Sequence, residues 1–239
     1  MFITGIHLLH DSFPTRDHYP FNLEILNRTD SVRFSQPVSF FIGENGTGKT
    51  TLLKAIARHC SIHIWEDADR RRYHHNRYED ELARHIRVDT KDGDIRGSFF
   101  SSEIFRHFAE ILDEWAAADP ATLDYFGSAS LVEKSHGQSH MAYFTHRFAR
   151  EGVYFLDEPE NALSPRRQLE LLQLFRQCAA TGKAQFIIAT HSPILLACPG
   201  AQIFCFDRIP VQEVAYEDTE YYRVYRDFLN NREQYLDGI

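Results

Sequence analysis

Short apolar runs separated by polar turns dominate residues 1–60 and predict a β-rich part there. The apolar positions in 2–8 predict a first strand, and the alternation of apolar and polar residues over 21–26 predicts a second. The continuous apolar run 38–42 predicts a buried strand. Apolar residues then recur at three- and four-residue steps over 52–57, so we expect a helix to follow this strand.

The pattern changes in residues 61–134, where a segment dense in charge and histidine is followed by helical spacing. Apolar positions lie three and four residues apart in 81–86 and 104–115, which predicts a mainly helical insertion in the core. The arginines between 70 and 87 are interleaved with tyrosines and are a candidate contact for nucleic acid. Acidic residues nearby favour a solvated, salt-bridged surface instead.

Residues 135–239 contain two more apolar runs, and each predicts a buried strand. The run 152–158 ends in two acids, and the run 185–193 leads to a histidine. Between them, Ser164 and Pro165 form a good cap and first position for a helix. The chain has no internal repeats, and its length suits either one large domain or two small ones.

Composition narrows the function classes. The chain has 239 residues, of which 43% are hydrophobic, enough for a sizeable core. The formal net charge of −8 argues against a protein that coats nucleic acid, although a local basic face is still compatible with it. Four cysteines are scattered without metal-ligand spacing, and no apolar stretch reaches the length of a membrane span. We therefore expect a cytoplasmic protein without membrane insertion.

A glycine-rich loop follows the predicted strand 38–42 and fits the pattern G-x-x-x-x-G-K-[ST] of a phosphate-binding loop. Its glycines allow a tight turn in which successive backbone N–H groups point at phosphate oxygens, and the following helix directs its positive end there. Lys49 is placed to reach the β- and γ-phosphates, and the Thr50 hydroxyl to ligate Mg²⁺. The predicted nucleotide-binding residues are Gly43, Glu44, Asn45, Gly46, Thr47, Gly48, Lys49, Thr50 and Thr51.

Three polar residues after the later strands complete a candidate catalytic site. Asp157, at the carboxyl end of a buried strand, fits a role in holding Mg²⁺. Glu158 is the candidate general base that polarises the attacking water. His191 is a candidate donor to the γ-phosphate that senses its loss. In the loop 11–20, Tyr19 is a candidate for stacking on adenine, but packing of its ring on the sheet is an equally good interpretation.

In this order and spacing, the motifs resemble those of the ABC-type ATPases. Ser135-His136-Gly137-Gln138 looks like the last part of the ABC signature, although His136 stands where that family has glycine. More narrowly, residues 157–165 and 189–196 look like those of the small single-domain bacterial ABC-type proteins of the AAA family, which are relatives of chromosome-maintenance and break-repair ATPases. This resemblance implies a single domain over residues 1–239. The resemblance implies an α/β P-loop NTPase fold of ABC-ATPase type, with a mixed sheet core and an N-terminal antiparallel β part. It also implies that Glu103, after 97–102, replaces the usual glutamine loop.

The same resemblance implies ATP and Mg²⁺ as ligands and a head-to-tail homodimer that forms on ATP binding. In such dimers the signature of one chain closes over the ATP on the phosphate loop of the other. The leading hypothesis is an ATP hydrolase that acts on a partner protein or nucleic acid, in DNA maintenance or defence. The alternatives are an ATP-dependent binding module with little hydrolysis, and the ATPase subunit of a transporter.

Overall fold

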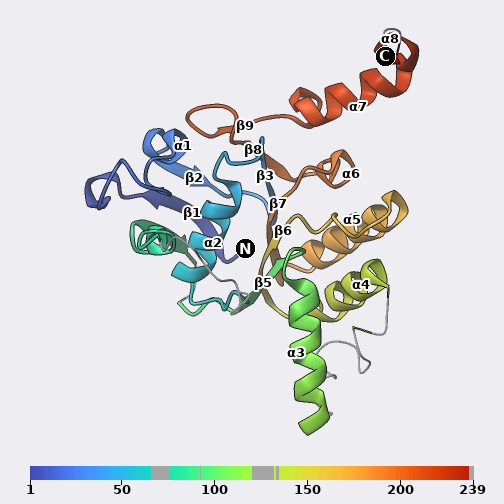
Figure 1. Cartoon of the computed structure of the whole chain (residues 1–239), viewed down its shortest axis with the longest axis horizontal. Coiled ribbons are helices and arrows are strands. Elements are labelled where there is room, and N and C mark those ends of the chain that lie inside the picture. The colour runs from blue at the N-terminus through green and yellow to red at the C-terminus, as the bar shows by residue number, and fades with distance from the viewer. Residues whose placement is uncertain (66–75, 92, 120–131, 133–134, 237–239) are drawn as a thin grey trace.

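A six-stranded sheet forms the centre of the computed structural model, which describes residues 1–65, 76–91, 93–119, 132 and 135–236 (Figure 1). The strand order is β5-β6-β7-β3-β8-β9, and all neighbours are parallel except β8 and β9. The strands are β3 (Val38–Ile42), β5 (Gly97–Ser101), β6 (Gly152–Asp157), β7 (Ala184–Ala189), β8 (Gln202–Cys205) and β9 (Gln212–Glu213). The predicted strands at 38–42, 152–158 and 185–193 are therefore confirmed, and they lie in the middle of this sheet.

A second, antiparallel sheet has the order β2-β1-β4, with β1 (Ile3–Leu8), β2 (Ser31–Arg33) and β4 (Ile86–Thr90). It confirms the N-terminal antiparallel part and the first strand. The segment 61–134 has the helix α3 (Phe105–Ala118) as its longest described element, as its helical spacing predicts. The same segment also supplies β4 and β5, two strands that its pattern does not predict.

Two hydrophobic layers cover the faces of the main sheet. On one face α2 (Lys49–His59) packs between this sheet and the small sheet, in a core that includes Leu52 and Ile187. On the other face lie α3, α4 (His136–Arg147), α5 (Pro165–Ala180) and α6 (Pro193–Leu196) (Figure 1). The ring of Phe186 on β7 lies 4.9 Å from those of Phe148 and Phe175, so aromatic packing joins the helices to the sheet.

The predicted strand at 21–26 is wrong, because this segment leads into the short helix α1 (Glu24–Arg28). The amide of Asn27 donates to the carbonyl oxygens of Phe21 (2.6 Å) and Leu23 (3.0 Å), which folds the chain back on itself. Ile25 and Leu26 are buried side by side, whereas a strand would direct them to opposite faces. Apolar alternation over a few residues therefore does not distinguish a strand from a buried turn of helix here.

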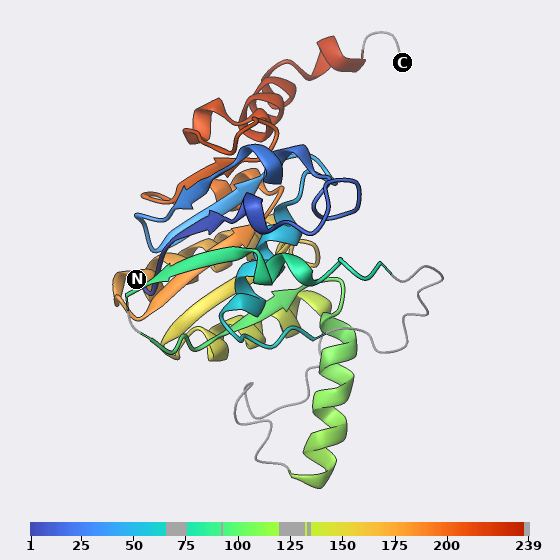
Figure 2. The ribbon, with the colours of Figure 1, turned by 90° about the vertical axis from the view of Figure 1, so that its left-hand side faces the viewer.

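The C-terminal helices α7 (Glu220–Asn230) and α8 (Arg232–Leu236) extend away from the body (Figures 1 and 2). No residue of α7 is buried, and only its first turn contacts the site described below. The short 3₁₀ helices are η1 (His10–Ser12), η2 (Glu81–Arg84) and η4 (Tyr216–Asp218). Within the described ranges, no helix is both long and apolar enough to span a bilayer.

Candidate nucleotide site

Parallel pairing brings the carboxyl ends of three strands to one edge of the main sheet. Phe41 of β3 and Asp157 of β6 both pair with Ala189 of β7. The chain leaves these strands as the glycine loop, as the acid pair and as the segment that contains His191. The edge of an open parallel sheet where strands end is the usual place for a ligand. The register therefore gathers residues that are far apart in the sequence.

The glycine loop has the backbone that its sequence predicts. Gly46 and Gly48 have φ angles of 85° and 100°, which are readily adopted only by glycine. Gly48 is the residue before α2, so the loop turns directly into the positive end of that helix. The Asp207 carboxylate, after β8, accepts the backbone N–H of Glu44 at 2.8 Å and braces the start of the loop.

Lys49 is the first residue of α2 and is only 5% exposed. Its ammonium donates to the carbonyl oxygens of Gly43 (2.6 Å) and Glu44 (2.9 Å), so the side chain lies across its own loop. Burial lowers the pKa of Lys49, and the carboxylate of Asp207 opposes that shift. Phosphate oxygens are stronger acceptors for this ammonium than carbonyl oxygens are.

Thr50 and Asp157 form a pair suited to a hard cation. The Thr50 hydroxyl donates to Asp157 Oδ1 at 2.8 Å, and Asp157 is 8% exposed. Burial raises the pKa of Asp157 to about 6. A hydroxyl and a carboxylate oxygen fit Mg²⁺, which takes few protein ligands and relies on phosphates and water for the rest. Consistent with this, the described residues contain no group of three or more His, Cys, Asp or Glu side chains that could hold a metal by themselves.

Glu158 has a left-handed backbone with a φ of 49°, which is unusual for a residue other than glycine. Asn161 donates from its side-chain amide to Glu158 Oε2 at 2.6 Å. The other carboxylate oxygen, Oε1, lies 3.6 Å from His191 Nε2, which is too long for a direct hydrogen bond. Asn161 thus fixes one oxygen of the candidate base and leaves the other directed at the candidate sensor.

His191 is held on two sides. Its backbone N–H donates to Glu160 Oε1 at 2.7 Å, and its ring Nδ1 lies 2.7 Å from the Tyr221 hydroxyl. Tyr221 also donates to the carbonyl oxygen of Gly43 at 3.0 Å and so links α7 to the phosphate loop. Sequence motifs do not predict the contacts of Tyr221, Asn161, Glu160 and Asp207, because only the fold brings these residues to the site.

Tyr19 lies at the same site. Its hydroxyl is 2.7 Å from Thr51 Oγ1, and 41% of the residue is exposed. The hydroxyl therefore contacts the first turn of α2, and adenine stacking stays a prediction. Glu103 is exposed in the turn after β5, whose last residue, Ser101, pairs with Asp157. Its predicted role beside the metal site stays untested.

The signature segment begins α4. Ser135 caps the helix in a capping box with Gln138, and the side chains of Ser135, His136 and Gln138 are exposed. Gly137 packs closely on the loop after β6, where a Cβ would meet Ala162 O at 2.9 Å. In the part of the chain that the structure describes, no hydrogen bond or ion pair joins Ser135–Gln138 to the phosphate loop of the same chain. The hydrogen bonds of Ser135 and Gln138 stay within the start of α4.

The arginine-rich segment is only partly visible, since residues 66–75 lie outside the described ranges. Of the described arginines, Arg84 pairs with Glu81 at 2.9 Å and Arg87 with Asp89 at 3.2 Å. These pairs fit the salt-bridged surface better than a nucleic-acid contact. The contact that Arg70, Arg71 and Arg72 would make with nucleic acid stays a prediction.

Comparisons with known proteins point to one kind of fold. Residues 123–197 match the family model described as "AAA domain, putative AbiEii toxin, Type IV TA system". The chain is similar to the solved structure "An inward-facing conformation of a putative metal-chelate type ABC transporter", with 14% identity, a TM-score of 0.52 and coverage of 94% of this chain and 88% of that one. No curated protein matches the sequence.

Two further solved structures are similar at a TM-score of 0.49. One is cbiO1 from Clostridium perfringens, part of the ABC transporter complex cbiONQ, with 18% identity and coverage of 89% of this chain and 92% of that one. The other is the SMC head domain from Thermotoga maritima, with 13% identity and coverage of 90% and 99%. The fold assignment rests on the structural similarity to the metal-chelate type ABC transporter, with its TM-score of 0.52. This similarity confirms the predicted fold of ABC-ATPase type. The AAA-domain match covers the acid pair and His191, so it agrees with the predicted resemblance and supports an ATPase.

Proposed function

We propose that this chain, an ATPase of ABC/AAA type by fold and family match, hydrolyses Mg-ATP to open and close a head-to-tail homodimer that acts on a partner. One observation carries the proposal: the ends of β3, β6 and β7 bring Lys49, Asp157 and His191 to one edge of the sheet. Phosphoryl transfer to water requires groups that bind the phosphates, ligands for Mg²⁺ and a base that activates the water. The glycine loop, the Thr50–Asp157 pair and Glu158 next to His191 fit these three requirements.

The chain's own groups have separable roles in this reaction. The loop N–H groups and the start of α2 bind the phosphates, and Lys49 exchanges its two carbonyl contacts for phosphate oxygens. Thr50 and Asp157 hold Mg²⁺, which when bound neutralises charge on the transferred phosphoryl group. Glu158 accepts a proton from the attacking water at Oε1, because Asn161 occupies Oε2.

The exposed signature segment supports the proposed dimer. The start of α4 exposes the Ser135 and Gln138 side chains at the positive end of a helix, which favours an anion. Since these residues make no hydrogen bond to their own phosphate loop in the described structure, we assign them to the ATP of a second copy. Closing the site with a second chain would exclude bulk water and position the one water molecule that attacks the γ-phosphate.

Glu158→Gln tests the proposal, because it keeps the side-chain shape and an oxygen that can accept from Asn161 but removes the base. With saturating Mg-ATP, this variant is expected to accumulate as a dimer in light scattering, whereas wild type returns to monomer as ATP is consumed. Glu151→Gln, an exposed glutamate just before β6, is the matched control and should behave as wild type. A Glu158→Gln protein that stays monomeric at full ATP occupancy would refute the sandwich dimer.

A second variant tests the signature segment separately from the phosphate loop. Ser135→Arg should block dimer formation and turnover and leave ATP binding to single chains intact, because the side-chain hydrogen bonds of Ser135 go to Gln138 in its own helix. Wild-type turnover by Ser135→Arg would contradict the signature role. If Mg-ATP binds and drives dimerisation but is not hydrolysed by wild type, the binding-module alternative holds.

The structural likeness to a transporter chain favours one further candidate, the ATPase subunit of a transporter. Turnover that responds to single- or double-stranded DNA would favour the DNA-directed role, whereas turnover that rises only with a membrane partner would favour the transporter. We further propose a cytoplasmic location, since Cys60, Cys178, Cys198 and Cys205 are all unpaired, as in a reducing compartment.

A further inference from the structure

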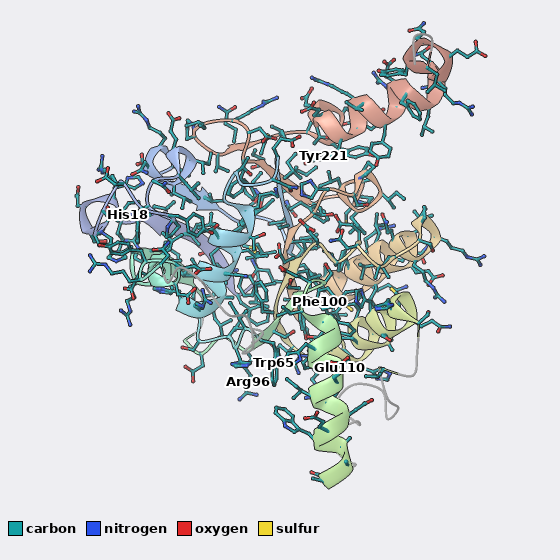
Figure 3. All side chains as sticks on the ribbon, viewed as in Figure 1. His18, Trp65, Arg96, Phe100, Glu110 and Tyr221 are labelled. Carbon is teal, nitrogen blue, oxygen red and sulfur yellow. The ribbon has the colours of Figure 1, made fainter. Side chains whose placement is uncertain are left out.

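The first turn of α7 reaches the nucleotide site through a single side chain. Figure 3 labels Tyr221 at the base of this projecting helix. Thr219, 1% exposed, caps the helix by accepting the backbone N–H of Tyr222 and so fixes this turn against the body. The Tyr221 hydroxyl lies between the carbonyl oxygen of Gly43 at 3.0 Å and Nδ1 of His191 at 2.7 Å. Tyr221 therefore touches both the phosphate loop and the candidate sensor.

The tautomer of His191 depends on where the phenolic proton of Tyr221 lies, because the hydroxyl is within hydrogen-bond distance of both Gly43 O and His191 Nδ1. A carbonyl oxygen can only accept, so we assign the phenolic proton to Gly43. With this assignment, Nδ1 carries a proton and donates it to the phenolic oxygen at 2.7 Å. In the neutral imidazole, Nε2 consequently has a lone pair and no proton.

Nε2 of His191 has no protein partner that would compete with a ligand. This atom is buried and makes no hydrogen bond among the described residues, and the Glu158 carboxylate lies 3.6 Å from it. Burial lowers the pKa of His191, and Lys49 on α2 lowers it further, whereas Glu158 after β6, Glu44 in the loop and Asp207 after β8 raise it. Glu160 faces the backbone N–H of His191, and Tyr221 on α7 faces Nδ1. The net shift favours the neutral ring before nucleotide binds.

We propose that Tyr221 is a positioning residue that couples recognition of the γ-phosphate by His191 to the uptake of one proton. The inference rests on the proposed function, in which the triphosphate lies beside His191. Because Nδ1–H is held by Tyr221, the ring can donate to a phosphate oxygen from Nε2 only after a solvent proton binds there. No covalent bond changes; the imidazole becomes an imidazolium that donates at both nitrogens. ADP lacks the γ-phosphate and so does not draw this proton.

The test is a proton count by isothermal titration calorimetry in two buffers of different protonation enthalpy, near pH 7.5. Mg-AMP-PNP and Mg-ADP are titrated into wild type, Tyr221→Phe and Tyr225→Phe. In wild type the triphosphate analogue should take up about one proton more per site than ADP does. In Tyr221→Phe this difference should fall to about zero, since the neutral ring is then free to carry its proton on Nε2. Tyr225, 53% exposed on the same helix, is the matched control and should leave the count at the wild-type value.

The outcomes separate this inference from the proposed function. Binding of both nucleotides with the same proton count in wild type and Tyr221→Phe would overturn the coupling and leave the ATPase proposal intact. Failure of wild type to bind either nucleotide would overturn both. If Tyr221→Phe does not fold, the ¹⁵N shifts of His191 in nucleotide-free wild type decide, because a ring protonated on Nε2 would contradict the tautomer. A ring protonated only on Nδ1, which gains a second proton with AMP-PNP and not with ADP, would support it.

Discussion

The buried carboxyl group of Asp157 should make the nucleotide-free protein less stable as pH rises. Its pKa is raised from 3.8 to about 6 by burial, and Asp157 is 8% exposed, so solvent screens little of the effect. The folded state therefore holds a proton that the unfolded chain releases. This contribution to stability is complete below about pH 4 and is lost as pH rises through about 6.

Asp157→Asn removes the titration while keeping an oxygen that can accept the Thr50 hydroxyl. A shift from 3.8 to about 6 corresponds to about 3 kcal/mol of unfolding free energy at pH 7.5 and about 1 kcal/mol at pH 4.5. We expect Asp157→Asn to be more stable than wild type by these amounts when magnesium is absent. The stability advantage of Asp157→Asn should grow as pH rises from 4.5 through about 6 and should then level off.

The assay is urea unfolding in EDTA at four pH values between 4.5 and 8, followed by tryptophan fluorescence. Asp11→Asn, at an exposed position, controls for the loss of a surface charge. With Mg-nucleotide the order should reverse, because wild type gains the free energy of binding and Asp157→Asn loses much of it. A stability difference that is the same at every pH, or an Asp157→Asn protein that is less stable than wild type at pH 7.5 in EDTA, would show that burial does not raise the pKa of Asp157.

Two further predictions concern positions where the structure leaves little freedom. Gly97→Ala should destabilise the fold by about 3 kcal/mol or more in urea unfolding, since its Cβ would lie 1.9 Å from Val153 O on the neighbouring strand. Gly93→Ala, with nothing within 4 Å of the added Cβ, should cost little, and equal losses for the two would contradict the steric account. Asn161→Ala should lower kcat by about tenfold or more while the Kd for ATP stays the same, because only the position of the Glu158 carboxylate changes. An unchanged kcat would show that Asn161 does not position the base.

Local sequence patterns predicted the parts of the site that are contiguous in the chain. The glycines of the loop and the acids after 152–156 need only their immediate neighbours to specify a turn and a strand end. The apolar alternation at 21–26 wrongly predicted a strand, because it takes no account of the Asn27 side-chain amide, whose hydrogen bonds to the backbone stabilise a turn there. The strand 97–101 was missed because its pairing partner lies more than fifty residues away in β6.

The contacts that link the motifs could not be predicted in this way. Tyr221 is 178 residues from Gly43, and the sequence around it does not identify it as a residue of the nucleotide site. Asp207 likewise braces the loop across 163 residues. Such pairs arise from the strand order, which places β8 beside β3, and a single sequence does not specify that order.

The left-handed backbone at Glu158 also bears on how this chain would change over many generations. A non-glycine residue in that conformation costs of order 1–3 kcal/mol, and here it is held by hydrogen bonds from its own N–H to Ala189 O and from the Asn161 N–H to its carbonyl oxygen. Substitution by glycine would relax the backbone and remove the candidate base in one step. If Glu158 is the base, mutation at this codon would tend to give more stable proteins that bind nucleotide without hydrolysing it, and only selection for turnover would oppose that tendency.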